Sequence, residues 1–368
     1  MIRAHTDVVG SLLRPPELLA ARERFDRGEA SAADLKRAED RAVDAAVRLQ
    51  EEAGMDVVTD GEMRRLSFQS GLPEAVSGFG RVPLEAYLWG DWYGDEVGDR
   101  ATERPEGLGV REPLRRIRHI AAEDFTYLRG RAAAIPKVTL TSPSLYANLW
   151  SPAESREAYP TLDAFLEDVA AITRDEIAEL ARLGCTYIQL DAPHYPLLID
   201  DRTRAFYESQ GWSVEEWLDR GIELDNWVMQ GHPGVTFGFH LCRGNQGSRW
   251  LASGGYEPIA RRVFSGVAAH RLLLEYDDER SGSFQPLAHV PDDRMVVLGL
   301  VTTKSGRRET PEELERRIRE AAAHVDLERL AVSPQCGFAT SVVGNAITTD
   351  DQRAKLEVLA RTAERVWR

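Results

Sequence analysis

Short apolar, β-branched segments alternate with amphipathic helical segments along most of this chain. Such alternation favours a parallel sheet, because parallel strands need a crossover connection that is usually a helix. Eight strands are the number that a (β/α)8 barrel requires, and an open doubly wound sheet is the alternative. The eight candidate strands are residues 8–11, 56–62, 137–143, 187–193, 235–242, 271–276, 294–303 and 330–337. We therefore predict an α/β protein with a TIM-barrel fold.

Capping signals support the helices that lie between these strands. Ser31 and Thr161 each precede an amphipathic segment, and Thr310 precedes Pro311, a residue that favours the first turn of a helix. The predicted helices are residues 31–53, 161–183, 214–230, 256–268, 310–324 and 350–367.

One segment, residues 76–116, breaks the alternation. It contains the sequence WGDWYGDEVGD, which is dense in glycine, aspartate and aromatic residues. We interpret it as a long insertion between the second and third strands of one barrel, with residues 1–368 forming a single TIM-barrel catalytic domain. Trp89, Trp92 and Tyr93 could stack on a planar substrate, although packing within the insertion is the alternative that we favour.

The composition of the chain limits the classes of molecule that the protein could bind. The chain carries 46 lysine and arginine residues against 60 aspartate and glutamate residues, a formal net charge of −14, and the basic residues form no stripe. This pattern argues against a nucleic-acid or anionic-membrane surface. No segment approaches the roughly 20 apolar residues that span a bilayer. We expect a soluble, cytoplasmic protein that binds small molecules. Whether it forms a homo-oligomer stays open.

Three cysteines in a chain of this length do not make a disulfide framework, so each is considered singly. Cys185 begins its predicted strand and is expected to be an inert buried thiol. His240 and Cys242 lie two residues apart on a predicted strand, so their side chains point to the same face. This pair alone is weak evidence for a metal, although imidazole and thiolate are both ordinary zinc ligands.

Two further residues strengthen the metal interpretation. Glu275 ends the apolar strand RLLLE, where a buried carboxylate is costly without a positive partner. Cys336 ends another strand and is followed by Gly337, which permits close approach of the backbone. In a barrel all four candidate ligands fall at the C-terminal rim, where the active sites of barrel enzymes lie. The sequence therefore predicts one Zn²⁺ site.

Several motifs then resemble a known family. The HxC pair, the LLxE strand and SPQCGF occur in the same order as in the C-terminal catalytic barrel of cobalamin-independent methionine synthases, within the uroporphyrinogen decarboxylase/methionine synthase-like superfamily. VVGSLLRP near the N-terminus, TDGE at 59–62 and IQLDAP at 188–193 resemble further motifs of that family. The resemblance covers most of the chain and implies a TIM barrel.

The resemblance also implies an activity, which is transfer of a methyl group to a zinc-activated thiol. The thiol would most simply be homocysteine, and the product methionine. The implied zinc ligands are His240, Cys242, Glu275 and Cys336, and the residues implied to bind homocysteine are Ser11, Glu62 and Asp191.

Departures from the family pattern leave the methyl donor open. Ala192 stands where the family's IQxDEP motif has glutamate, and LGLVTTKSGRRET lacks the histidine that methionine synthases have after strand seven. The donor could be a methylfolate or a methylcorrinoid. A thiol alkyltransferase of the epoxyalkane:coenzyme M transferase type is an alternative, and a barrel that binds zinc or a thiol without turnover is another. No cofactor-binding residues are identified besides the zinc ligands.

Candidate general acids follow the strand that carries Asp191. His194 and Tyr195 could protonate a leaving group, and we take His194, with Asp191, as the predicted catalytic pair. A histidine in a barrel loop is as often a hydrogen-bonded structural residue. Lys304 lies after the seventh strand, where barrel enzymes often bind phosphate or sulfonate groups.

Overall fold

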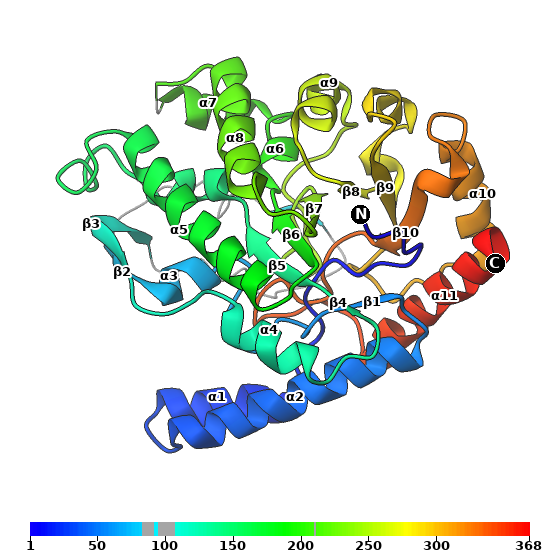
Figure 1. Ribbon diagram of the computed structural model, residues 1–368, viewed down its shortest axis with the longest axis horizontal. Helices are drawn as coiled ribbons and strands as arrows, with labels where there is room; N and C mark the ends of the chain where they lie inside the picture. The colour runs from blue at the N-terminus through cyan, green and yellow to red at the C-terminus, as the bar shows by residue number, and fades with distance from the viewer. Residues whose placement is uncertain (83–91, 95–106, 210) are drawn as a thin grey trace.

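A six-stranded parallel sheet forms most of the barrel wall in the computed structural model, which describes residues 1–82, 92–94, 107–209 and 211–368 (Figure 1). Its strand order is β10-β9-β8-β7-β6-β5, so each strand pairs with its neighbour along the chain. These strands confirm six of the eight predicted ones. Their bounds are β5 Val138–Thr141, β6 Tyr187–Asp191, β7 Thr236–Leu241, β8 Arg271–Glu275, β9 Met295–Val301 and β10 Leu330–Pro334.

Two short elements complete the TIM barrel. Strand β1 (Val57–Val58) pairs in parallel with β4 (Ile135–Pro136), which leads directly into β5. On the other side, the N-terminal segment joins β10 through a parallel bridge between Thr6 and Val332. Thr6 and Asp56 then connect this segment to the start of β1, because each side chain accepts a hydrogen bond from the other residue's backbone N–H, at 2.8 and 3.1 Å.

The predicted strand at residues 8–11 is wrong, because the N-terminal segment makes only the single bridge at Thr6. The backbone beyond Thr6 bonds to turns and side chains instead of a strand ladder. The carbonyl of Gly10 accepts from the Thr59 hydroxyl at 2.6 Å, and the N–H of Leu12 donates to the carbonyl of Gly61 at 3.0 Å. The segment still occupies the first position of the barrel.

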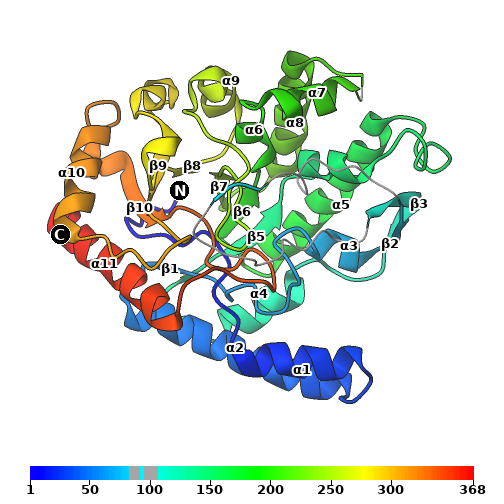
Figure 2. The same cartoon turned by 180° about the vertical axis from the view of Figure 1, so that it is seen from behind.

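Helices cover the outside of the barrel, as Figures 1 and 2 show from opposite sides. The six predicted helices are α2 Ala32–Glu52, α5 Leu162–Arg182, α8 Val214–Met229, α9 Glu257–Gly266, α10 Pro311–Ala321 and α11 Thr349–Trp367. The hydroxyls of Ser31, Thr161 and Thr310 cap three of them as expected. Among the described residues, no helix is long and apolar enough to span a membrane.

Five helices were not predicted from the sequence, and all but α1 are shorter than any of the six predicted ones. They are α1 Pro16–Asp26, α3 Gly71–Ala75, α4 Ala122–Arg129, α6 His194–Leu197 and α7 Asp201–Ser209. The 3-10 segments are η2 Pro143–Leu149, η3 Glu279–Ser281, η4 Gln285–His289 and η5 Leu327–Arg329.

The predicted insertion begins and ends as an antiparallel hairpin. Strand β2 (Val76–Arg81) pairs with β3 (Leu108–Arg116), so the hairpin spans the bounds that the sequence suggested. Between them, Tyr93 exchanges two backbone hydrogen bonds with Trp250, at 2.8 and 3.0 Å, in the loop after β7. The insertion therefore returns to the barrel rim. Trp89 lies outside the described residues.

Alternate residues of each strand point into the barrel. On β6 these are Tyr187, Gln189 and Asp191, which run from the floor of the barrel to its rim, and all three are buried. One part of the interior is apolar, formed by Leu273, Met295, Val297 and Ala331. The other part is polar and includes two buried cations.

Asp7 holds this polar part together. Its carboxylate accepts from Lys137 Nζ at 2.8 Å, from the Tyr187 hydroxyl at 2.6 Å and from Arg271 Nη2 at 3.2 Å. All these side chains are fully buried. Arg271 also donates to two carbonyls of the N-terminal segment. The two cations keep the pKa of Asp7 below its ordinary value, although burial alone would raise it.

We expect Asp7→Ala to destabilise the protein strongly, because it leaves two buried cations without their carboxylate. The cost of leaving a buried charge uncompensated is about 3–5 kcal/mol. Glu52→Ala is the matched control, since the Glu52–Arg353 pair is exposed and such pairs contribute about 0–1 kcal/mol. Urea denaturation would measure both. Equal losses of stability in the two variants would contradict this account of Asp7.

Candidate metal and substrate site

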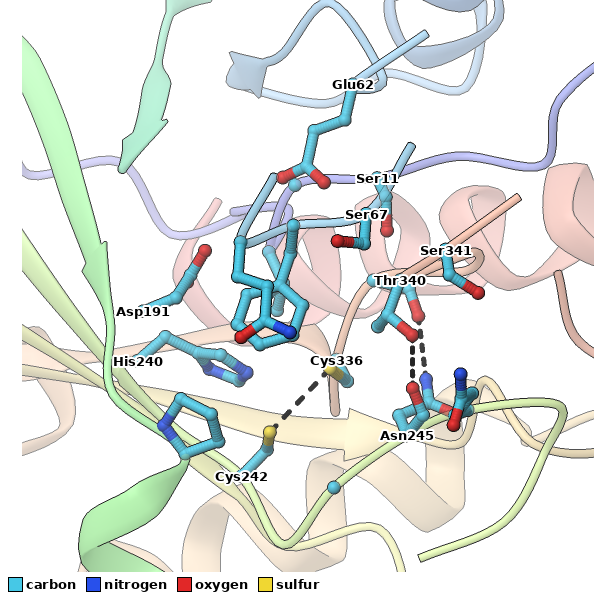
Figure 3. A pocket seen from close by; sticks show the side chains of 18 of the residues that line it. Ser11, Glu62, Ser67, Asp191, His240, Cys242, Asn245, Cys336, Thr340 and Ser341 are labelled. Atoms are coloured by element: carbon cyan, nitrogen blue, oxygen red, sulfur yellow. Dashed lines mark hydrogen bonds between the residues drawn. The ribbon is translucent and has the colours of Figure 1, made fainter. Parts of the chain in front are cut away.

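Three predicted ligands come together at the C-terminal rim of the barrel (Figure 3). His240 lies on β7, Cys242 follows that strand by one residue, and Cys336 follows β10. The potential ligand atoms all lie within 4.8 Å of one another, and the two Sγ atoms are 3.9 Å apart. All three residues are buried. An imidazole and two thiols at this spacing suit a tetrahedral Zn²⁺ site with one further position.

A hydrogen bond at Nδ1 orients the His240 ring so that Nε2 is left for this group. Nδ1–H donates to the carbonyl of Leu273 at 3.2 Å. Nε2 is buried and has no hydrogen-bond partner among the described residues. A metal-binding histidine is usually held in this way, with one nitrogen bonded to the protein and the other directed at the metal. His240 therefore fits the ligand role in its orientation as well as its position.

Glu275 lies beside this group, but its carboxylate is bound elsewhere. It ends β8, which pairs with β7, and it is completely buried. Oε1 accepts from Arg280 at 2.7 Å and lies 3.5 Å from Lys304 Nζ, while Oε2 accepts from the backbone N–H of Arg243 at 2.6 Å. Nearby positive charges hold the pKa of Glu275 below its ordinary value against the effect of burial. Its role as fourth ligand stays a prediction.

Two predicted substrate-binding acids line the same cavity, Asp191 beside His240 on the neighbouring strand and Glu62 farther from the two cysteines (Figure 3). Glu62 accepts from the Thr139 hydroxyl at 2.8 Å and lies 3.7 Å from Arg65, while its Oε2 is buried without a hydrogen-bond partner among the described residues. Asp191 accepts from Gln189 Nε2 at 2.7 Å. Burial, with a contribution from Glu62, raises the pKa of Asp191 to about 7. Two acids in one buried cavity suit a cationic group.

The backbone at Glu62 is in an uncommon conformation. Its φ angle is 55°, in the left-handed region that non-glycine residues rarely adopt, and it follows Gly61 with a φ of 68°. Such residues often lie at functional sites, where the surrounding structure compensates for the strain. The turn directs the Glu62 side chain into the cavity.

Ser11, the third predicted substrate residue, also lines the cavity. Its Oγ accepts a long hydrogen bond of 3.4 Å from the N–H of Ala339. Gly337 lets it approach closely, because a Cβ at that position would lie 2.1 Å from Ser11 Oγ. Gly10 has the same function for Glu62, since its Cβ would lie 2.4 Å from Glu62 Oε1. Both glycines are therefore needed for the shape of the site.

Other lining residues were not identified from the sequence, because they lie on loops without a periodic pattern. Asn245 joins two of these loops: its Nδ2 donates to the carbonyl of Gly337 at 2.9 Å and to the Thr303 hydroxyl at 3.0 Å. An apolar side of the cavity is formed by Phe68, Trp92 and Leu251. Trp92 is the one described residue of the predicted aromatic group that lines the cavity.

His194 does not line the cavity. It is fully buried behind the rim, where its Nε2 lies 2.8 Å from Ser144 Oγ. Ser144 in turn contacts Asp225, which also accepts from the Tyr195 hydroxyl at 2.6 Å. Burial lowers the pKa of His194 to about 3, so the imidazole is neutral at physiological pH. This position gives no support to the predicted acid role, which stays a prediction.

Cys185 is buried two residues before β6, as expected. Burial raises the pKa of its thiol to about 12, so the thiolate is scarce at neutral pH. It lies at the opposite end of the strand from Asp191 and takes no part in the site.

Known proteins are similar to this chain over most of its length. The model of the family described as "Cobalamin-independent synthase, Catalytic domain" matches residues 4–102 and 138–355. The uncharacterized protein YxjH of Bacillus subtilis is 35% identical over 98% of this chain and 94% of its own length. A methionine synthase of Pyrococcus abyssi is 28% identical over 90% of this chain and 86% of its own. The fold is shared with a B12-independent methionine synthase from Shewanella, solved with selenomethionine, at a TM-score of 0.74, 21% identity and coverage of 99% and 97%.

The buried acid behind the rim makes a pH-dependent contribution to stability that can be measured. Burial raises the pKa of Asp225 from an ordinary value of 3.8 to about 7. Between these pH values the folded protein holds a proton that the unfolded chain has released. The contribution of Asp225 to the free energy of unfolding is therefore largest at low pH. It decreases as pH rises between the two pKa values, by up to about 1.4 kcal/mol per pH unit. Asp225→Asn should remove this slope.

Urea denaturation at a series of pH values would compare Asp225→Asn with the wild type. The difference in free energy of unfolding should change between about pH 4 and about pH 7 and be constant above. A difference that does not vary with pH would contradict the raised pKa.

Proposed function

Since the chain belongs to the family of cobalamin-independent synthase catalytic domains, we propose that it is a zinc-dependent methyltransferase that converts the thiol of homocysteine into the thioether of methionine. The observation that carries this proposal is one cavity lined both by the group His240, Cys242 and Cys336 and by the two acids Glu62 and Asp191. The first group suits a metal and a sulfur atom. The second suits an ammonium group.

In this proposal the nucleophile is the substrate thiol, and the residues around Cys242 and Cys336 would activate it. His240, Cys242 and Cys336 would hold Zn²⁺, with Glu275 as the predicted fourth ligand. When bound there, Zn²⁺ favours the thiolate form of a substrate thiol at neutral pH, where a free thiol is mostly protonated. The substrate sulfur would form a bond to the methyl carbon while the bond between methyl and donor breaks, with the electron pair of that bond leaving on the donor and the thiol proton being released.

The acidic side orients the amino acid. Glu62 and Asp191 would accept hydrogen bonds from the substrate ammonium, and Ser11 would donate to its carboxylate. Fixing both ends of the amino acid positions its sulfur near the cysteines, and such orientation is a large part of catalysis. The methyl donor, a methylfolate or a methylcorrinoid, would approach along the apolar side formed by Phe68, Trp92 and Leu251.

Zinc binding should depend on Cys336. We expect Cys336→Ser to lose most of its zinc and its methyl transfer activity together, because a serine hydroxyl is a far poorer zinc ligand than a thiolate. Stability should also fall, since a ligand that binds only the folded state stabilises it. Elemental analysis of purified protein would measure the metal. Cys185→Ser is the matched control and should keep its zinc, whereas full zinc and turnover in Cys336→Ser would refute the site.

Glu62 should determine recognition of the amino group. We expect Glu62→Gln to weaken homocysteine binding by tens-fold or more, because removing one partner of a buried charge pair costs on the order of 2–5 kcal/mol. Binding of 2-mercaptoethanesulfonate, which has no amino group, should change little. Calorimetry with the zinc-loaded protein would measure both. If the wild type prefers 2-mercaptoethanesulfonate and Glu62→Gln changes neither affinity, an alkyltransferase of the coenzyme M type is favoured instead.

A further inference from the structure

Arg14 is a buried arginine whose guanidinium binds two separate loops at the rim of the barrel. It lies just before α1 and is 8% exposed. Nη2 donates to the carbonyls of Glu62 and Arg65, at 3.1 and 2.8 Å, and Nη1 donates to those of Ala339 and Ser341, at 2.9 and 3.0 Å. All acceptors of Arg14 among the described residues are main-chain carbonyls. Burial lowers the pKa of Arg14 to about 10, so the guanidinium is still a cation at physiological pH.

The two loops that Arg14 joins both line the cavity (Figure 3). The β1 loop (residues 59–70) follows β1 and supplies Glu62, while the β10 loop (residues 335–346) follows β10 and supplies Cys336. The loops also meet directly in one antiparallel bridge. Arg14 therefore lies where the residues around the predicted metal connect to a predicted substrate-binding acid.

The β1 loop needs support at Glu62, because the backbone is strained there. The left-handed conformation of a non-glycine residue persists only where the surrounding structure determines it, and the φ angle of Glu62 is 55°. The N–H of Glu62 donates to Asp60 Oδ1 at 2.9 Å, and its carbonyl accepts from Arg14. The second bond of Nη2, to the carbonyl of Arg65, holds the same turn three residues further on. Without Arg14 the turn could relax, and Glu62 would no longer be directed into the cavity.

The β10 loop offers a firm anchor for Arg14. Cys336 lies two residues beyond β10, all five residues of which pair with β9. The N–H of Gln335 continues this pairing by donating to the carbonyl of Val301 at 2.8 Å. The carbonyls that Arg14 binds lie three and five residues beyond Cys336. The position of this cysteine therefore depends on the strand, while Arg14 connects a firmly held loop to the strained one.

We propose that Arg14 is a positioning residue that holds the Glu62 carboxylate in the cavity and thereby determines the affinity for an amino-acid thiol. The inference rests on the recognition of homocysteine by Glu62 in the proposed function. Arg14 does not line the cavity, so it acts through the backbone of the β1 loop and not on the substrate. Lysine is a poor replacement, because its donors share one nitrogen atom, whereas the planar guanidinium presents donors on separate nitrogens to the two loops.

Calorimetry of thiol binding to the zinc-loaded, full-length protein would test this role. We expect Arg14→Lys to weaken homocysteine binding by about tenfold, because a hydrogen bond from a charged donor no longer holds the Glu62 turn. The affinity for 2-mercaptoethanesulfonate and the zinc content should be unchanged, since neither depends on Glu62. An arginine with only a structural role would affect the stability of the protein but not the affinity of the folded molecules.

Arg329→Lys is the matched control. Arg329 also donates to main-chain carbonyls, those of Pro291 and Arg294, at 2.5 and 3.0 Å. It directly precedes β10, so it lies at the end of that strand away from the cavity. Both thiols should bind this variant as they bind the wild type. If Arg14→Lys does not fold, Arg14→Gln, which buries no charge, carries the same comparison.

A double-mutant cycle shows whether Arg14 acts through Glu62. In Glu62→Gln, which has no carboxylate to position, adding Arg14→Lys should cause no further loss of homocysteine affinity. A further tenfold loss in that background would overturn the inference, as would an unchanged homocysteine affinity in the Arg14 variants, equal weakening of both thiols or loss of zinc. A wild type that does not bind homocysteine, or a Glu62→Gln protein that binds it normally, would instead refute the proposed function.

Discussion

The buried ion pairs that Asp7 makes with Lys137 and Arg271 are the interactions on which the barrel depends most. The first barrel segment has a single strand bridge, so backbone pairing alone holds it weakly. Asp7 compensates by binding Lys137, which precedes β5, and Arg271, which begins β8 on another part of the wall. This buried ion-pair network closes the barrel from within. It also fixes the segment that carries Ser11 into the cavity.

The same network reaches the substrate site through one amide. Lys137 only donates hydrogen bonds, and its Nζ lies 2.7 Å from Gln189 Oε1. The amide must therefore turn its NH2 group toward the carbonyl of Val9, at 2.8 Å, and toward Asp191 Oδ1, at 2.7 Å. A cation at the barrel floor thus orients an acid at the rim, so that stability and the geometry of the cavity have a common origin.

Much of this structure could be predicted from sequence because its signals are local. Strand β7 shows its buried character and its two candidate ligands within a few residues, and Ser31 marks a helix start by itself. The first barrel segment was misjudged because VVGS has the composition of a strand, while its partners, such as Thr59, are side chains and turns distant in sequence. The burial of His194 could not be predicted for a related reason. Its place after an active-site strand is visible in the sequence, whereas its burial behind the rim depends on packing against Ser144.

Glu275 and Asp191 illustrate a further limit, since residue type alone does not reveal how a buried acid is neutralised. Cations hold Glu275 in its charged form, and this depends on Arg280, five residues further on in a 3-10 turn that has no sequence signature. Asp191 lacks a comparable cation, and burial beside Glu62 keeps its pKa near 7. A positive group from the ligand would therefore favour the ionised form of Asp191. In the proposed function that group is the substrate ammonium, so this buried acid would favour an amino-acid thiol over a simple one.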